Sequence, residues 1–397
     1  MKNQPASPAA PAPRLASIDA YRGFVMLLMM GEVLAFRSVA GALPESGFWK
    51  FLAHHQSHVE WIGCSLHDMI QPSFSFLVGA ALPFSLARRA AAGQPQWRLT
   101  LHAFARAMIL VLLGVFLRST GSDYTRWTFE DTLSQIGLGY GFLYLLGLRS
   151  ARVQGLALAL ILSGYWLLFA LYPLPGAAFD WAAAGARPEA MLHGFAAHWS
   201  LNTNPAAAFD RWLLNLFPPE HWFKNNAAGY CTLSFIPTLG TMLFGLLAGG
   251  VLRSGRTPSA KIRWFLIAGL ASLAAGWLAG ATGLCPVVKK IWTPSWALFS
   301  GGWSFLFLAG FYQVMDVWNR RSWAFALTVV GMNSIAAYLI AHLWAGFIER
   351  ALPRHFGRAW CTFAGAPYEH LIFGAGVLLT EWLILWWMQR NRIFLRV

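Results

Sequence analysis

Long apolar runs separated by short polar turns dominate the chain. A helix needs roughly 20 apolar residues to cross a bilayer core, and ten runs approach that length. They lie near residues 20–36, 66–87, 101–118, 132–148, 152–173, 229–252, 263–284, 296–315, 323–348 and 369–388. The pattern predicts an all-α polytopic membrane bundle of about ten transmembrane helices, with both termini on one side.

Composition agrees with this pattern. Of 397 residues, 57% are hydrophobic and 12% are charged, whereas soluble domains carry about 25% charged residues. No polar linker divides the chain, so we expect one membrane domain over residues 16–397. Residues 1–15 are rich in Pro and Ala and lack the apolar core of a signal peptide. We expect them to form a disordered tail.

The basic charge indicates topology rather than nucleic-acid binding. The net charge is +14, but Lys and Arg lie in short loops between apolar runs and not along one solvated face. Cytoplasmic loops carry an excess of these residues. The richer set of loops contains both chain ends and includes Lys2, Arg14, Arg88, Arg320 and Arg396. We therefore expect cytoplasmic termini and no nucleic-acid partner.

Histidine is concentrated on the opposite, outer side. The outer set is His54, His55, His58, His67, His193, His198, His221, His342, His355 and His370. Imidazole suits a wet interface, but any chemistry that uses histidine would have to take place there.

An extended outer loop near residues 174–228 places His198 and Asn202 among Trp and Phe side chains. Aromatic faces beside hydrogen-bonding amides suit a sugar ring. An interfacial aromatic belt would have the same composition, so both interpretations stay open.

The segment from His58 to Gly79 is the richest in polar chemistry. His58 lies just outside the membrane, Asp68 lies in the first turns of the second span, and Gln71 lies one turn deeper. An acid at this depth is costly unless it is paired or near water, which makes it a candidate functional residue. A neutral imidazole held by a carboxylate is a workable general base. A helix-capping or packing cluster is the competing interpretation.

Other polar residues interrupt the apolar runs. Glu32 lies in the middle of the first span, where Arg106 is a candidate counter-charge, and Glu381 in the last span is a weaker candidate. Gln135, Asn333 and Ser334 carry groups that can join helices by hydrogen bonds. Lys289 and Lys290 suit either a phosphate site or a solvated turn. The four cysteines, Cys64, Cys231, Cys285 and Cys361, lack metal-ligand spacing, so we expect no metal. We expect packed thiols, with a periplasmic disulfide as the alternative.

These segments together resemble the transmembrane acyltransferases related to heparan-alpha-glucosaminide N-acetyltransferase, including its bacterial NagX-like relatives. The resemblance covers nearly the whole chain. It is carried by Ser17-Ile-Asp19-Ala-Tyr-Arg22-Gly23, the His58 to Gly79 segment, Ser134-Gln135-Ile-Gly137, Gly229-Tyr-Cys-Thr-Leu, Lys290-Ile-Trp292-Thr-Pro294-Ser and Gly331-Met-Asn333-Ser334-Ile.

The resemblance implies an enzyme that takes acetyl from cytoplasmic acetyl-CoA and acetylates the amino group of a glucosamine across the membrane. The family's catalytic histidine maps onto His58, and Asp68, Asn333 and Ser334 would line the site. Members often carry Asn where this chain has Gly31-Glu32-Val33. We expect a small amino sugar as acceptor, a bacterial inner-membrane location and a possible homodimer.

A mechanism follows from the chemistry of the donor. Coenzyme A phosphates cannot cross a bilayer because their desolvation is too costly, but the pantetheine arm can thread between helices. His58 would act as base or form an acyl-imidazole, and Asn333 or Ser334 would donate to the oxyanion. Binding of the donor or acceptor is assigned to Glu32, Gln71, Gln135, Lys289, Lys290, Trp292, Asn333, Ser334, His342, His198 and Asn202.

Two other functions fit parts of the same pattern. An inner-membrane transporter of N-acetylglucosamine or a related sugar would use the polar core as a midplane site, but no inverted repeat is apparent. A membrane scaffold without catalytic activity would leave Glu32 and Asp68 without a role.

Overall fold

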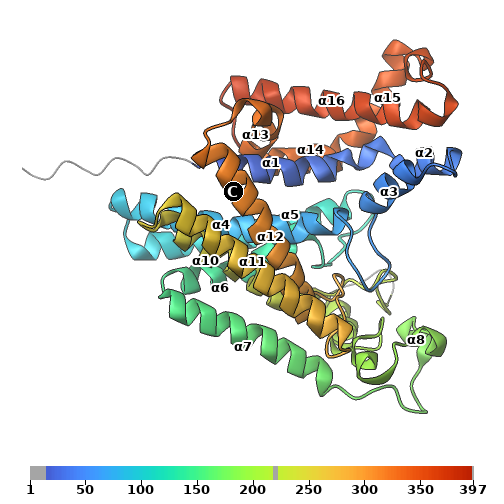
Figure 1. The fold of residues 1–397 in the computed structure, drawn as a ribbon. Helices are drawn as coiled ribbons and strands as arrows, with labels where there is room; N and C mark the ends of the chain where they lie inside the picture. The colour runs from blue at the N-terminus through green and yellow to red at the C-terminus, as the bar shows by residue number, and fades with distance from the viewer. Residues whose placement is uncertain (1–14, 218–221, 396–397) are drawn as a thin grey trace, which may run out of the picture.

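The structure is a computed structural model, and it describes residues 15–217 and 222–395 (Figure 1). The expected tail lies almost wholly outside the described residues, as do Lys2, Arg14, His221 and Arg396. Within the described residues every element of regular secondary structure is a helix, which confirms the all-α prediction. An isolated antiparallel bridge joins Ile62 to Val288.

The helices follow one another with short connections except in the segment between α7 and α10. Their bounds are α1 Ala16–Met30, α2 Phe36–Ala42, α3 Gly47–His55, α4 Ile70–Ala91, α5 Gln96–Ser119, α6 Thr132–Gly147, α7 Ala151–Ala170, α8 Trp181–Ala184, α9 Pro205–Leu213, α10 Phe235–Arg253, α11 Pro258–Ala281, α12 Pro294–Tyr312, α13 Phe325–Met332, α14 Ser334–Leu343, α15 Ala345–Phe356 and α16 Glu369–Arg390.

The described residues contain seven helical segments that are long and apolar enough to cross a membrane, or up to nine if two bent pairs each count as one span. The bent pairs join Ala16–Leu34 to Phe36–Ala42 at 43° and Ser322–Met332 to Ser334–Leu343 at 70°. The run expected near residues 132–148 forms α6, which has 16 residues. At 1.5 Å per residue it is about 24 Å long, shorter than a typical bilayer core.

Helices α4 and α10 form the close-packed centre of the bundle. A Cβ atom at Gly79 would lie 1.8 Å from the Met242 carbonyl oxygen, and one at Gly245 would lie 1.8 Å from the Phe76 carbonyl oxygen. Each helix therefore presents its backbone to the other where glycine removes the side chain. Small residues at such contacts are the usual means of packing helices without a solvent-driven hydrophobic force.

Helix α1 packs against α13, which comes from the last quarter of the chain. A Cβ at Gly23 would lie 1.7 Å from the Leu327 carbonyl oxygen, and one at Gly331 would lie 1.9 Å from that of Asp19. The Asp316 carboxylate accepts hydrogen bonds from the backbone N–H groups of Ala16 and Ser17, both at 3.1 Å. It satisfies orphan donors at the positive end of α1.

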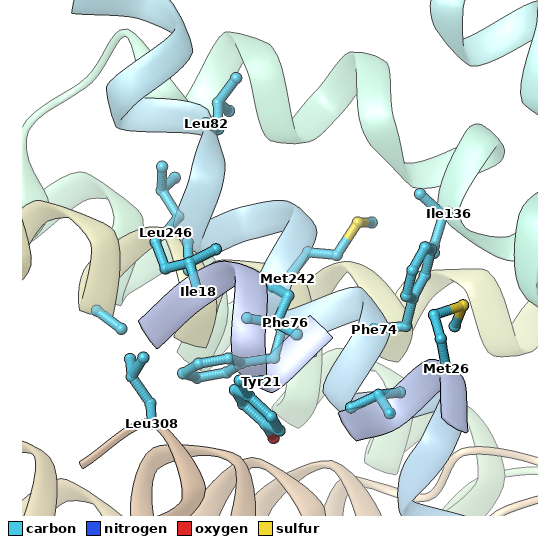
Figure 2. Packing of buried hydrophobic residues seen from close by; sticks show 14 of the residues in the cluster. Ile18, Tyr21, Met26, Phe74, Phe76, Leu82, Ile136, Met242, Leu246 and Leu308 are labelled. Carbon is cyan, nitrogen blue, oxygen red and sulfur yellow. The ribbon is translucent and has the colours of Figure 1, made fainter. Parts of the chain in front are cut away.

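Figure 2 shows the apolar core between these helices. Tyr21 and Met26 of α1, Phe76 of α4 and Met242 of α10 belong to this core, and all four side chains are at most 1% exposed. The Tyr21 hydroxyl donates to the Ser73 hydroxyl at 2.8 Å, so its polar tip is satisfied within the core.

The two ends of the bundle differ in structure (Figure 1). We call the end that carries α2, α3 and α8 the loop end. We call the end where Ala16 meets Asp316, and where residues 390–395 lie, the terminal end. Helix α16 connects the two, because Gly374 near its start contacts Val33 beside α2.

Candidate active site

Asp68 is fully buried at the loop end, in the 3-10 turn His67–Met69 that leads into α4. Its Oδ2 accepts hydrogen bonds from the Ser65 backbone N–H and the Ser65 hydroxyl, both at 3.0 Å, and from the Val59 N–H at 3.3 Å. The carboxylate thus folds the 57–66 loop over the end of the helix, and its Oδ1 is left for other partners.

His58 is the first of those partners. Its Nδ1 lies 2.8 Å from Asp68 Oδ1, while 43% of its side chain remains exposed. A carboxylate accepts only, so Nδ1 carries the proton and Nε2 of the neutral ring keeps a free lone pair. The geometry supplies an imidazole with its second nitrogen available for base or nucleophile chemistry.

Lys289 is the second partner. Its Nζ donates to Asp68 Oδ1 at 3.2 Å and lies 3.1 Å from His58 Nδ1. The turn that carries it is fixed to the His58 loop, because Gly63 N–H donates to the Val287 carbonyl at 3.0 Å. Two donors from distant parts of the chain therefore meet on one buried oxygen.

These contacts determine the charge of the cluster. Burial lowers the pKa of His58 below its ordinary value, the bond to Asp68 opposes that shift, and the Lys289 charge adds to it. Burial also lowers the pKa of Lys289, against the raising effect of Asp68. His58 is consequently neutral at neutral pH, the form that a base requires.

A second imidazole–carboxylate pair lies beside the first. His67 Nε2 lies 2.6 Å from Glu32 Oε1, and the His58 and His67 ring centroids are 4.7 Å apart. The Glu32 side chain is 59% exposed although it sits within a membrane-crossing segment. His67 was not among the residues predicted for the site, and its only sequence signal was its place next to Asp68 among the outer histidines.

The expected pairing of Glu32 with Arg106 is wrong. Arg106 lies on α5, where its guanidinium donates to the Tyr140 hydroxyl at 3.1 Å and sits over the Tyr140 ring. A hydropathy pattern does not show which faces of two helices meet, and the 3-10 turn Gly31–Leu34 after α1 instead places Glu32 beside His67, in the turn that leads into α4.

Comparison with known proteins adds evidence that the geometry alone does not supply. No family model matches the chain. Over 374 residues it is 25% identical to the human protein named heparan-alpha-glucosaminide N-acetyltransferase, covering 82% of this chain and 52% of the human one. The mouse protein of the same name is 22% identical over 440 residues, covering 99% of this chain and 62% of the mouse one.

The chain is a homologue of these acetyltransferases. The resemblance drawn from its sequence motifs is thereby confirmed. The chain spans about half the length of the human acetyltransferase and less than two thirds of the mouse one.

In this acetyltransferase homologue, Lys290 and Trp292 hold the Lys289 turn against the rest of the loop end. Lys290 Nζ donates to the Glu60 carbonyl at 2.6 Å and lies over the Tyr230 ring. Trp292 is buried with a positive φ of 47°, and its indole N–H donates to the Thr241 hydroxyl of α10 at 3.0 Å. A left-handed backbone conformation is strained for a residue as bulky as Trp292. The packing around the Lys289 turn therefore holds it in this conformation.

Two more expected residues belong to the same end of the bundle. Gln71 is buried in the first turn of α4, just below Asp68. His342 lies in the last turn of α14, stacks on Tyr338 and interacts electrostatically with Glu32.

Three of the expected site residues have structural partners elsewhere. The Gln135 side-chain amide donates to the carbonyls of Phe129 and Thr232. His198 contacts the Tyr172 carbonyl, and Asn202 donates to that of Gly185. The loop that carries His198 and Asn202 contacts the His58 loop, because the Trp61 indole donates to the Trp199 carbonyl at 3.0 Å.

Asn333 lies at the terminal end, away from the cluster. Its Nδ2 donates to the Ile393 carbonyl at 2.7 Å, and its Oδ1 accepts from Leu395 N–H at 3.1 Å. Helix α16 rises about 24 Å from Gly374, which contacts Val33 at the loop end, to Arg390 at the terminal end. Ser334 follows Asn333 as the first residue of α14. The oxyanion role expected for these two residues therefore does not fit the arrangement, because both side chains are far from His58.

The described residues contain no group of three or more His, Cys, Asp or Glu side chains placed to hold a metal ion. The four cysteines are free thiols, and burial raises the pKa of Cys64 to about 12.

Proposed function

We propose that the chain is a transmembrane N-acetyltransferase that moves acetyl from cytoplasmic acetyl-CoA to the amino group of a glucosamine-like sugar at the periplasmic face of a bacterial inner membrane. The observation that carries the proposal is the half-exposed His58 imidazole held through Nδ1 by buried Asp68. The homologues bear the name of an acetyltransferase that acts on an alpha-glucosaminide.

In the direct route, the nitrogen of the acceptor amine attacks the thioester carbonyl, and His58 Nε2 takes a proton from that nitrogen. The new C–N bond forms, the C–S bond breaks, and the leaving thiolate takes the proton from the imidazolium. Asp68 stabilises the imidazolium through its bond to Nδ1, as a carboxylate partner does for a general base.

In the covalent route, Nε2 itself attacks the thioester carbonyl and the thiolate leaves. The acyl-imidazole then passes its acetyl group to the amine, whose proton goes to water or to a neighbouring base. The Nδ1 bond to Asp68 serves both routes, because it fixes the tautomer that exposes the Nε2 lone pair.

Glu32 and His67 suit recognition of the acceptor. An amino sugar is an ammonium cation at neutral pH, and the exposed Glu32 carboxylate offers it a counter-charge next to the reacting imidazole. Once the ammonium is bound there, the His67–Glu32 pair can accept the proton that the amine must lose before it attacks.

The donor enters from the opposite compartment in this proposal. Its phosphates stay in water because their burial is prohibitive, and the uncharged pantetheine arm brings the thioester to His58. Lys289 is buried beside Asp68 and Lys290 is bonded to the Glu60 carbonyl, so neither lysine is assigned to the nucleotide.

The test uses purified protein in liposomes, with labelled acetyl-CoA on the terminal-end side and glucosamine on the loop-end side. We expect N-acetylglucosamine to appear with the wild type and with His54→Ala, whose imidazole is exposed on the neighbouring helix α3, and not with His58→Ala. Uptake of sugar without acetylation would instead show a transporter. Label on His58 in acid-quenched protein without sugar would select the covalent route.

Glu32→Gln tests the acceptor site. We expect KM for glucosamine to rise about tenfold, because the variant removes a charge that faces the ammonium. KM for acetyl-CoA should stay unchanged. A variant whose KM for glucosamine equals that of the wild type would remove Glu32 from the acceptor site.

A further inference from the structure

Two cavities lie on either side of the chain after α16, and the larger extends from the terminal end along α14 as far as Leu343 and Trp344. The larger is a groove of about 700 Å³ between α14 and α16. Its lining is Ala336, Leu339, Ile340, Leu343, Trp344, Thr380, Leu383, Ile384, Trp387, Met388, Ile393 and Leu395. Apart from the Thr380 hydroxyl and the Trp indoles, these side chains are apolar. The groove is open to the membrane, since Leu383 and Trp387 on its wall are 43% and 57% exposed.

The smaller cavity is about 590 Å³ and carries positive charge. It is lined by Phe325, Met332, Trp386, Gln389, Arg390, Arg392 and Phe394. Neither cavity includes an acidic side chain in its lining. Arg390 lies over the Trp386 ring, and within the described part of the chain neither arginine forms an ion pair with a carboxylate.

The tail from Arg392 to Leu395 separates the two cavities. Ile393 and Leu395 line the apolar groove, while Arg392 and Phe394 line the basic cavity. Asn333 holds this tail through hydrogen bonds to Ile393 and Leu395. An apolar groove therefore lies against two cations at the level where α16 leaves the membrane.

We propose that this region binds one anionic phospholipid, with its phosphate on Arg390 and Arg392 and an acyl chain in the α14–α16 groove. A large exposed apolar groove in a membrane protein is covered by lipid or by protein. Two arginines at its edge that have no acidic partner among residues 15–217 and 222–395 favour a lipid with a negative headgroup, because basic residues near the membrane surface attract anionic lipids. The two arginines lie at the opposite end of the bundle from the His58 cluster, and the proposed lipid site does not depend on the proposed reaction.

The test is native mass spectrometry of the detergent-purified protein titrated with dioleoylphosphatidylglycerol or dioleoylphosphatidylcholine. We expect the phosphatidylglycerol to bind about tenfold more tightly, from two charges at the surface. The double variant Arg390→Gln/Arg392→Gln should lose that preference. The matched control Arg253→Gln/Arg256→Gln, at the end of α10 and in the turn after it, should keep it.

The groove has its own pair of variants. Leu383→Trp, which fills the groove from its exposed wall, should weaken both lipids at least fivefold. Leu379→Trp, one turn earlier on α16 and outside the lining, should not. Both positions are already exposed to the membrane, so neither change needs the core to repack.

Several results would overturn the proposal. These are equal affinity for the two lipids, an unchanged preference in Arg390→Gln/Arg392→Gln, or displacement of phosphatidylglycerol by millimolar inorganic phosphate. A further one is a Leu383→Trp protein that shifts from dimer to monomer with its lipid binding intact, since a second copy of the chain would then cover the groove.

Discussion

One buried carboxylate oxygen connects three segments at the residue scale. Oδ1 of Asp68 lies 2.8 Å from the His58 imidazole and 3.2 Å from the Lys289 ammonium, while Oδ2 fixes the 57–66 loop. The ion pair with Lys289 compensates the burial of Asp68, since an unpaired charge there would be very costly. It also leaves His58 next to a pair whose charges largely cancel, rather than next to a bare anion.

Lys289→Met should therefore raise the pKa of His58. With the ammonium gone, the anion alone faces the ring, and the pKa of His58 should increase. Base catalysis needs neutral His58, so the rate falls as pH drops through this pKa. The acid limb of kcat/KM against pH should move to higher pH in the variant. A limb that stays in place or moves to lower pH would mean that Lys289 does not act through His58. Thermal unfolding of the variant measures the accompanying loss of stability separately.

At the scale of secondary-structure elements, the closest helix contacts are made at glycine residues. Between α4 and α10, Gly79 and Gly245 allow backbone contact that no side chain could permit. Between α9 and the 3-10 turn Thr232–Ser234 that precedes α10, the contact is polar instead. The buried Asp210 accepts the Thr232 N–H through Oδ2 at 2.9 Å, and its Oδ1 has no partner in the described structure.

Gly79→Ala should lower the thermal stability of the detergent-purified protein by several degrees, because its Cβ would lie 1.8 Å from the Met242 carbonyl. Gly250→Ala on α10 is the matched control, since a Cβ there meets nothing within 4 Å. In that control the better helix propensity of alanine should leave stability equal or slightly higher. Equal melting temperatures for the two variants would contradict the close contact of α4 and α10.

Asp210 should make stability depend on pH. Burial raises its pKa to about 7, well above the value of about 3.9 in an unfolded chain. The stabilisation from its protonated form is complete below the unfolded pKa and is lost as pH rises through about 7. Asp210→Asn should flatten the melting temperature between pH 5 and pH 8, and raise it at pH 8 by a few degrees. A wild type that becomes more stable over this interval would refute the assignment.

At the scale of the whole molecule, sequence pattern and structure agree on helices and diverge on contacts. The apolar runs predicted the long helices because each run is local. Local pattern also placed His58 and Asp68 near one another, since ten residues separate them. The sequence assigned Lys289 to donor or acceptor binding and did not predict its ion pair with Asp68, 221 residues away, because such a contact depends on how α4 and the turn before α12 pack.

The terminal end illustrates the same limit. Asn333 was expected at the active site from a motif resemblance, yet its amide binds the chain after α16. A polar residue in an apolar run signals that it has a partner, but the partner is identified only when the helices are assembled.

The charge distribution predicts the orientation of the whole bundle. A cysteine at Gly255, between α10 and α11, should react with a membrane-impermeant maleimide only after cells are opened. A cysteine at Ala227, in the long outer loop, should react in intact cells. Both positions are exposed, and a background that lacks the four native cysteines removes their signal. The reverse labelling pattern would place the termini in the periplasm.

The packing of α1 on α13 has a consequence for biosynthesis. Gly23 of α1 packs against Leu327, which the ribosome synthesises 304 residues later. At about 5–20 residues per second, the ribosome needs roughly 15–60 s to reach it. During that interval the first helix must stay in the bilayer with its backbone-contact face uncovered. We therefore expect nascent chains stalled before α13 to remain bound to the insertion machinery and to be degraded once released.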